Sequence, residues 1–301
     1  MLIKSRSLPD DLKIMRSLNT RMLLPEKDKK YYSNREKGFE GEVIFDILTE
    51  KLQSICLILN DLLLEVKNNE FQIDSNIIFQ ETIYLFDVKN YDGDFFCKGD
   101  RFYTRSGDEI KNPQIQLQRC ESLFRQYLQN PGMNFSVEAY VVFINPEFTL
   151  YQAALDTPFI FPNQLTRFMK KLNMKQSTLS ERHTKLANQL IADHKTKSRY
   201  TLLPQYEYEK VQKGVTSASC NSFNVSVRER NLVCEECGAE EDIDSAVIRT
   251  VEEFKLLFPE RKITTNQVQE WCQIVESKKT IGRILKKYYK AMGYGQWSYY
   301  E

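Results

Sequence analysis

The stretch FQIDSNIIFQETIYLFDVKNYDG, from Phe71 to Gly93, predicts a β-hairpin. Apolar and β-branched residues run along both arms, Ile73 to Phe79 and Thr82 to Val88, and such residues favour strands. The turn is expected at Gln80 and Glu81. Neither a Gly nor an Asn fixes that turn, so the register rests on the pattern of the two arms.

Three charged residues of this hairpin point to one site. Side chains alternate along a strand, so Asp87 and Lys89 share a face, and a turn at that place sets Asp74 opposite Asp87. Like charges in opposite positions destabilise a sheet and raise a carboxyl pKa unless a counter-charge is present. A divalent cation together with Lys89 would supply that charge, which makes a candidate hard-metal site. The alternative is a solvated hairpin face with ordinary surface charges.

The composition is typical of a globular protein that can bury a core. The 301 residues are 42% hydrophobic and 28% charged, with a formal net charge of +1, and this length favours two or three domains. No apolar run is long enough to cross a membrane and no signal-peptide segment is evident, so we expect a cytoplasmic protein. Seven mostly scattered cysteines argue against a disulfide framework. Only two histidines, His183 and His194, are present, which argues against a His-based nuclease or hydrolase.

Residues 1–34 are polar and charged and are predicted to form a helical arm. The next helix is expected to start at Ser33, which opens an S-x-x-E capping pattern. Glu42 lies beside the apolar stripe of this helix, where it could reach a site between helix and sheet; a solvated helix residue is the alternative. Gly38 and Gly41, one turn apart, indicate close approach to a neighbouring backbone.

Asn112 and Pro113 predict the start of another helix, with Asn as the cap and Pro in the first position. Gln116 follows about one turn later and could face a site at the helix N-terminus, an end that also favours phosphate. An exposed surface Gln is the alternative. The apolar run Val137 to Ile144 is expected to be a buried central strand. The order helix, strand, strand, helix, strand indicates an α/β domain with a mixed sheet.

Residues 167–199 are rich in Lys and Arg, with only Glu181 and Asp193 opposing them. This basic segment is compatible with binding to a polyanion, and a solvated helical face would look similar.

Three cysteines form half of a zinc-ribbon pattern plus one residue: Cys220, and then Cys234 and Cys237 in a C-x-x-C spacing. Zinc ribbons use two such pairs to coordinate the metal tetrahedrally. Ser217 holds the place of the fourth cysteine. Two alternatives stay open: three thiolates hold zinc weakly with an outside ligand, or the ribbon persists on packing without metal.

The C-terminal tail predicts two amphipathic helices separated by Ser277, one over 268–275 and one over 281–288. A basic helix after a short turn suggests a helix-turn-helix, with Tyr294 to Tyr300 as a β wing. A plain helical hairpin is the alternative, but the second helix has no acidic residue between Lys278 and Glu301, which favours nucleic acid. The candidate DNA-binding residues are Lys278, Lys279, Arg283, Lys286, Lys287 and Lys290.

These motifs together resemble the nuclease-related domain (NERD) family of bacterial proteins, in the PD-(D/E)xK nuclease-like superfamily. The matching stretches are GFEGE (38–42), FQIDSNIIF (71–79), FDVKNYDG (86–93) and NPQIQ (112–116), followed by a strand that ends in INP (144–146). The rest resembles family members with an appended zinc ribbon and helix-turn-helix. The chain departs from the family at Ser217 and mildly at Asp87, where Glu is commoner.

The resemblance implies a restriction-endonuclease-like core that hydrolyses DNA with Mg²⁺ or Mn²⁺. Asp74 and Asp87 would be metal ligands, and Lys89 would orient or deprotonate the attacking water. Glu42 would be an assisting carboxylate, and Gln116 would position water or phosphate. A non-catalytic DNA-binding or regulatory protein that retains the fold is the alternative.

The expected domain organisation has five parts, and no pattern bears on the oligomeric state. They are an N-terminal arm (1–34), a nuclease-like domain (35–172), a basic connector (173–203), a zinc-ribbon-like module (204–240) and a helix-turn-helix-like tail (241–301).

Overall fold

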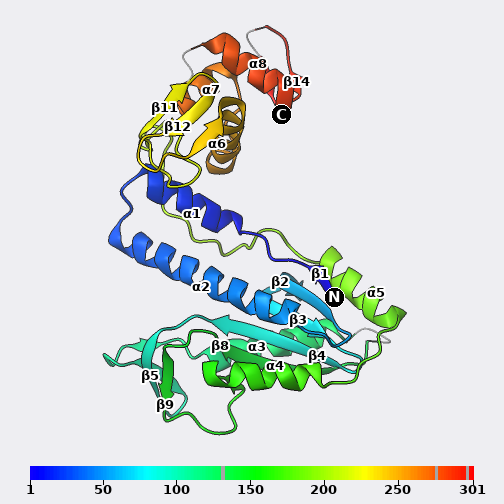
Figure 1. Cartoon of the computed structure of the whole chain (residues 1–301). Coiled ribbons are helices and arrows are strands. Elements are labelled where there is room, and N and C mark those ends of the chain that lie inside the picture. The colour runs from blue at the N-terminus through cyan, green and yellow to red at the C-terminus, as the bar shows by residue number, and fades with distance from the viewer. Residues whose placement is uncertain (130–132, 275–276, 296–297) are drawn as a thin grey trace. The chain divides into compact units, whose positions relative to one another are not determined.

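The computed structural model describes residues 1–129, 133–274, 277–295 and 298–301, which divide into two compact units (Figure 1). Unit 1 comprises Met1–Leu8 and Ser33–Thr201, and unit 2 comprises Pro9–Tyr32 and Leu202–Glu301. Within the described ranges, no helix has both the length and the apolar character needed to span a membrane.

The main sheet of unit 1 has six strands and is mixed, in the order β1-β2-β3-β4-β8-β10. The neighbours β2, β3 and β4 are antiparallel, whereas β1 pairs with β2, β8 with β4 and β10 with β8 in parallel. The predicted mixed sheet is therefore confirmed. The strands are β1 (Leu2–Lys4), β2 (Leu57–Val66), β3 (Asn69–Ile78), β4 (Thr82–Lys89), β8 (Ser136–Phe143) and β10 (Phe159–Ile160).

Helices cover both faces of this sheet. One face packs against α2 (Glu26–Glu50) and α4 (Leu165–Asn173), which place Phe45 and Leu172 in a cluster with Phe86 of β4. The other face packs against α3 (Pro113–Tyr127) and α5 (Glu181–Ala192), which place Phe124 and Leu190 in a second cluster. Burial of both faces explains why β4 and β8 are apolar nearly throughout.

The predicted hairpin is formed by β3 and β4. Its register runs from Ser75 opposite Phe86 to Ile78 opposite Ile83, as the turn at Gln80 and Glu81 requires. The register is therefore confirmed, although the regular pairing stops one step before Asp74 and Asp87.

The side chains of β2 and β3 change face part of the way along the strands. In β2, Leu59 packs in the same cluster as Leu62, although an odd and an even residue of a regular strand face opposite sides. The register of β2 and β3 is the same on both sides of Asp61, from Asn60 opposite Ser75 to Leu62 opposite Ile73. Asp61 itself has no partner in the ladder. Asp61 adopts a left-handed backbone with φ of 55°, which is uncommon for a residue other than Gly. The alternation used to predict faces therefore fails at this point.

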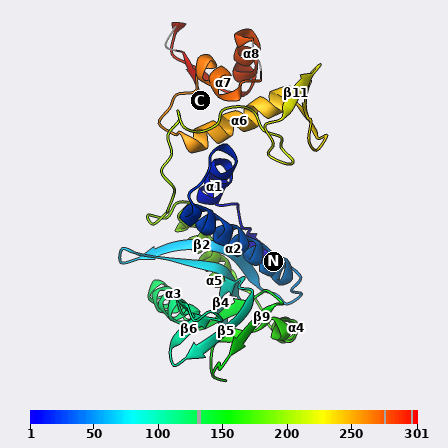
Figure 2. The same ribbon diagram turned by 90° about the vertical axis from the view of Figure 1, so that its left-hand side faces the viewer.

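A second, four-stranded sheet lies in unit 1, in the order β7-β6-β5-β9 (Figure 2). Tyr91, between β4 and β5, stacks on Phe95 at 5.4 Å between ring centroids, so an aromatic cluster continues from the end of β4 into this sheet. The strands are β5 (Gly93–Lys98), β6 (Arg101–Thr104), β7 (Glu109–Ile110) and β9 (Phe148–Tyr151), and a short 3-10 helix, Pro162–Gln164, precedes α4.

Two segments differ in part from the predictions. The N-terminal arm is helical over residues 10–21 and again from Glu26, as predicted, but it begins with β1, which pairs with the edge of β2, and α2 begins at Glu26 rather than Ser33. The segment predicted as a connector contains α5, whose residues Leu186 and Leu190 are fully buried against the sheet. Apolar burial therefore makes α5 part of the core of unit 1.

Unit 2 is a helical assembly with a small sheet. Its core surrounds Trp271, which is fully buried. The helices are α1 (Asp10–Arg21), α6 (Ile243–Leu257), α7 (Thr265–Cys272) and α8 (Lys278–Tyr288). The strands β11 (Val225–Arg228), β12 (Asn231–Cys234) and β13 (Glu240–Asp242) form an antiparallel sheet, and β14 (Ala291–Met292) pairs with β15 (Tyr299–Tyr300).

The two predicted tail helices correspond to α7 and α8, while α6 was not predicted. Ile281 and Leu285 of the predicted apolar stripe are buried, but Tyr288, at the end of the predicted range 281–288, is half exposed. Val275 of the first predicted helix and part of the predicted wing lie outside the described residues.

Candidate active site

Asp87, Lys89 and Gln116 meet on the α3 side of the main sheet. Lys89 Nζ lies 2.8 Å from Asp87 Oδ1, and Gln116 Nε2 donates to the same oxygen at 3.1 Å. Asp87 and Lys89 share a face of β4 because they are two residues apart. Gln116 reaches them because α3 starts where predicted, with Asn112 accepting a capping hydrogen bond from the Gln114 N–H.

Asp74 joins this group from the neighbouring strand. Its Oδ2 accepts a hydrogen bond from the backbone N–H of Val88 at 2.7 Å. The Asp74 carboxylate thus binds a backbone N–H of β4 beyond the last regular pair of β3 and β4. The structure therefore places Asp74 beside the Asp87–Lys89 segment.

Glu42 comes from α2, and an arginine that the sequence analysis left without a role holds it. Arg6 Nη1 donates to Glu42 Oε2 at 2.6 Å, and Arg6 Nε donates to Asp46 Oδ2 at 2.9 Å. Arg6 Nη2 donates to the backbone oxygen of Asp74 at 2.6 Å. Arg6 therefore links Glu42 to Asp74 across two elements.

Burial dominates the electrostatics of these groups. It raises the pKa of Glu42 to about 8, with the Asp74 charge adding to the effect and Arg6 opposing it. Burial likewise raises the pKa of Asp87 to about 6, against the effect of Lys89, and it raises the pKa of Asp74. Burial alone would lower the pKa of Lys89, but the Asp87 and Asp74 carboxylates raise it above the usual value. Lys89 is therefore an ammonium ion beside carboxylates that are costly to ionise.

The donor set suits a hard cation. Asp87 Oδ2 is buried and forms an ion pair with Lys89 Nζ at 2.8 Å, and carboxylate oxygens are the preferred ligands of Mg²⁺. Glu42, Asp74 and Asp87 do not form a group whose ligand atoms all lie within 4.8 Å of one another. A Mg²⁺ ion commonly uses one or two carboxylates and keeps several waters, so Asp74 and Asp87 fit such an ion without a third carboxylate.

Gly41 lets α2 approach the loop that follows β4. A Cβ at Gly41 would lie 2.5 Å from Asn90 Cβ and 3.1 Å from Ile144 Cγ2, whereas one at Gly38 would have open space. Asn90 Nδ2 also donates to the backbone oxygen of Lys37 at 2.7 Å. The predicted close approach thus holds for Gly41 and was wrong for Gly38.

The three cysteines of unit 2 lie together. Within the described residues, Cys220, Cys234 and Cys237 are the sole His, Cys, Asp or Glu group of three with ligand atoms within 4.8 Å of one another. Cys220 Sγ and Cys234 Sγ are 3.5 Å apart, and Ser217 Oγ lies 3.6 Å from Cys237 Sγ. The Ser217 hydroxyl, with further hydrogen bonds, lowers the pKa of Cys237 to about 6. Three sulfurs and one hydroxyl therefore surround one small volume.

All six candidate DNA-binding residues of the tail are exposed. Two of them already have an acidic partner, because Arg283 and Lys287 contact the two carboxylate oxygens of Asp244 in α6, at 2.9 and 3.2 Å. An acid distant in the sequence thus lies against the basic helix.

The basic segment 167–199 is partly neutralised within unit 1. Lys195 and Arg199 form ion pairs with Glu65 and Glu70, and Arg182 pairs with Glu81. The buried His183 contacts the backbone oxygen of Gln80 at 2.9 Å. His194 Nδ1 accepts from the Leu63 N–H at 3.1 Å. These contacts fasten the segment to the hairpins of the sheet.

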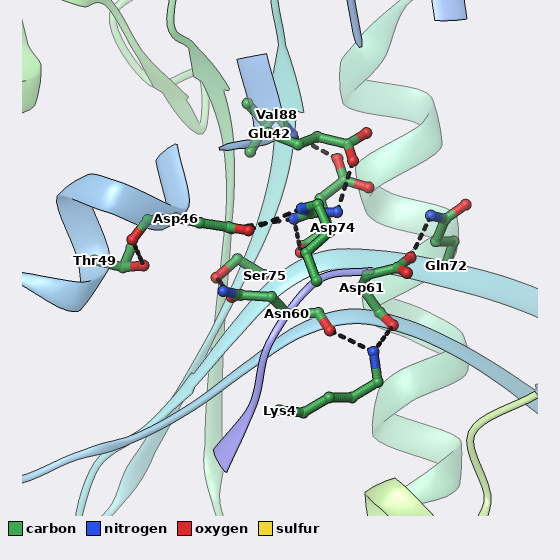
Figure 3. A network of polar contacts seen from close by, with 11 residues as sticks. Lys4, Glu42, Asp46, Thr49, Asn60, Asp61, Gln72, Asp74, Ser75 and Val88 are labelled. Atoms are coloured by element: carbon green, nitrogen blue, oxygen red, sulfur yellow. Dashed lines mark hydrogen bonds and ion pairs between the residues drawn. The ribbon is translucent and has the colours of Figure 1, made fainter. Parts of the chain in front are cut away.

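Three residues that the sequence patterns did not predict lie beside Glu42 and Asp74: Arg6, Asp46 and Asp61. Figure 3 shows Asp46 and Asp61 together with Glu42 and Asp74. Asp61 contributes its charge to the raised pKa values of Glu42 and Asp74. No local motif marks these residues, because only the pairing of β1 with β2 and the packing of α2 bring them to the site.

Comparison with known proteins bears on the part of unit 1 that carries these residues. Neither the curated proteins nor the solved structures include a match to the chain. Residues 37–144, which contain Glu42, Asp74, Asp87, Lys89 and Gln116, match the family model of the nuclease-related domain, NERD.

Proposed function

We propose that unit 1 is a metal-dependent nuclease that hydrolyses phosphodiester bonds in DNA, and that the basic part of unit 2 directs it to its substrate. The match to the nuclease-related domain suggests a nuclease-related function for residues 37–144. The observation that carries the proposal is the convergence of Asp87, Lys89 and Gln116 beside Asp74.

The residues would divide the chemistry as follows. Asp74 and Asp87 would hold Mg²⁺ or Mn²⁺, which when bound polarises the phosphoryl group and activates water. Lys89, kept as an ammonium ion by the two carboxylates, would orient the attacking water and stabilise negative charge that develops on the phosphate. The Gln116 amide would position water or a phosphate oxygen, and Glu42 would assist as a further carboxylate.

The basic helix of unit 2 supports the targeting part of the proposal. The exposed basic residues of α8 would contact DNA phosphates, in exchange for the Asp244 contacts of Arg283 and Lys287. A separate proposal for unit 2 is that Cys220, Cys234 and Cys237 bind zinc, because a tetrahedral zinc ion holds its thiolates about 3.8 Å apart. With Ser217 in the fourth position, that ion would lack one thiolate, so the binding would be weak.

The test is cleavage of supercoiled plasmid and of single-stranded DNA by the full chain, with Mg²⁺ or Mn²⁺ and with EDTA. Asp87→Asn removes a charge and little volume, so we expect it to abolish metal-dependent cleavage while the protein stays folded by circular dichroism. Asp156→Asn, on an exposed loop, is the matched control and should cleave normally. Cleavage by Asp87→Asn at the normal rate would refute the assignment. DNA binding without any cleavage would favour the non-catalytic alternative.

A further inference from the structure

We propose that Arg6 is a positioning residue of the candidate active site, which holds the Glu42 side chain and the Asp74 backbone in the arrangement that cleavage requires. The inference rests on the proposed nuclease function and assigns a role to a segment outside the matched residues 37–144.

The Arg6 side chain is buried and makes four hydrogen bonds from its three nitrogens. Its side chain is 4% exposed, and its guanidinium binds Glu42, both carboxylate oxygens of Asp46, and the Asp74 backbone oxygen. A planar fork with several donors can satisfy three acceptors at once, which a Lys ammonium at the same place would not reproduce. The contacts thus join α2 to β3 at the residue that begins the candidate metal site.

A local opening in the sheet creates the need for these donors. Asp61 and Asp74 face each other in the register of β2 and β3 but do not pair, although the residues on either side do. Lys4 Nζ donates to the backbone oxygens of Asn60 and Asp61 at 2.8 and 2.7 Å (Figure 3). Arg6 Nη2 donates to the backbone oxygen of Asp74. The two basic residues from the N-terminal segment therefore donate to the carbonyl groups of Asp61 and Asp74, at the step where the ladder is interrupted, and to that of the adjacent Asn60.

The place of Arg6 follows from β1. Lys4 pairs with Leu59 in the parallel register of β1 and β2, which sets the segment that follows it along Asp61 and Asp74. Asp46, the third partner, lies in a helical turn of α2 in which the Thr49 hydroxyl donates to the Asp46 backbone oxygen at 2.9 Å. Because every partner is on a regular element, Arg6 can fix the distance between Glu42 and Asp74.

Loss of the guanidinium would leave Glu42 and Asp46 buried without their cation and free the Asp74 backbone. Buried groups that lose a charged partner move or take up a proton, and a displacement of about 1 Å near reacting groups can cost about 100-fold in rate. The effect is expected on the chemical step rather than on DNA binding, because Arg6 is buried away from solvent.

The test compares Arg6→Gln, Arg6→Lys and the control Lys13→Gln in the full chain. Lys13 is a cation close to Arg6 in the sequence, and both it and its partner Asp10 are partly exposed. Loss of the Lys13 charge should therefore change neither cleavage nor Mn²⁺ binding. We expect Arg6→Gln to lower kcat about 100-fold with little change in KM for DNA. Arg6→Lys should recover part of that loss. Binding of Mn²⁺, measured by electron paramagnetic resonance without DNA, should weaken in Arg6→Gln, and thermal unfolding shows which variants are folded.

Two outcomes would overturn the inference. One is a folded Arg6→Gln protein with normal kcat and normal Mn²⁺ affinity, while Asp87→Asn is inactive; this leaves the proposed function standing. The other is a natural protein that neither binds Mn²⁺ nor cleaves DNA, which would refute the proposed function as well. If Arg6→Gln does not fold, the kcat and Mn²⁺ affinity of Arg6→Lys decide.

Discussion

Glu42 illustrates how the properties of single residues in this protein depend on burial. Its pKa is raised to about 8 by burial and by the Asp74 charge. A carboxyl group whose pKa is raised in the folded state contributes stability at pH below its unfolded value, near 4.5, and loses that contribution as pH rises through about 8. In metal-free protein, stability should therefore fall between these limits.

We expect Glu42→Gln to remove this pH dependence. As pH rises from 5 to 8, the free energy of unfolding of the variant should increase relative to that of the natural protein. The increase should be about 1.4 kcal/mol for each unit by which the folded protein raises the Glu42 pKa. Urea unfolding in EDTA at several pH values measures the difference. A difference that stays constant over this range would show that Glu42 titrates normally.

Ser217 decides how tightly the cysteine group holds a metal. Its hydroxyl lies 3.6 Å from Cys237 Sγ, so a thiol at this position would complete a four-thiolate site. We expect Ser217→Cys to raise bound zinc from less than one to about one ion per chain, by metal analysis after dialysis. Ser245→Cys, which adds a thiol on α6, should leave zinc unchanged. A full equivalent in the natural protein would show that three thiolates suffice.

At the scale of elements, α2 is the helix whose position sets the site, because Glu42, Asp46 and Gly41 all lie on it. Its two glycines make a matched pair of tests. Gly41→Ala would force a Cβ against Asn90, next to Lys89, and should destabilise the protein by about 1–3 kcal/mol and reduce cleavage. Gly38→Ala meets open space and should stabilise the helix by up to about 1 kcal/mol. Equal effects of the two changes on thermal unfolding would contradict the close approach.

The helix α8 separates two roles on its two sides. Ile281, Ile284 and Leu285 are fully buried, while Lys286 and Lys287 are exposed. We expect Lys286→Gln with Lys287→Gln to weaken DNA binding, because each Lys that binds a phosphate displaces counterions from the DNA. The slope of log affinity against log salt should become shallower by about 0.9 for each phosphate that the variant no longer binds.

Fluorescence anisotropy at several salt concentrations measures that slope. A control with Lys27→Gln and Lys30→Gln removes the same charge from exposed positions elsewhere in unit 2. If the α8 variant and the control behave alike, α8 does not face DNA, and the basic segment 167–199 becomes the better candidate.

At the scale of the whole molecule, unit 1 is assembled from segments distant in the sequence. The fragment 35–172 contains the predicted catalytic residues but lacks β1, Arg6 and α5. Leu186, Ala187 and Leu190 of α5 are fully buried in the core, so their loss exposes apolar surface. We expect this fragment to unfold without a cooperative transition and to lack cleavage. Cooperative unfolding together with normal cleavage would show that the fragment is an independent domain.

The sequence alone determined the local parts of this protein. The hairpin of β3 and β4, its register and the capped start of α3 follow from alternation and from Asn112 and Pro113, because strand pairing across a short turn and helix capping depend on neighbouring residues. The same local signals predicted which charged residues would approach one another around Asp87 and Lys89.

The tertiary structure decided what surrounds them. Arg6 reaches Glu42 and Asp74 only because β1 adds to the edge of β2, a contact between segments more than fifty residues apart. The opening at Asp61 reverses the faces of β2 and β3, and α5 becomes core because the sheet leaves an apolar face for it to cover. Burial by these distant segments sets the pKa values of the site, and the sequence pattern does not predict which segments will bury it.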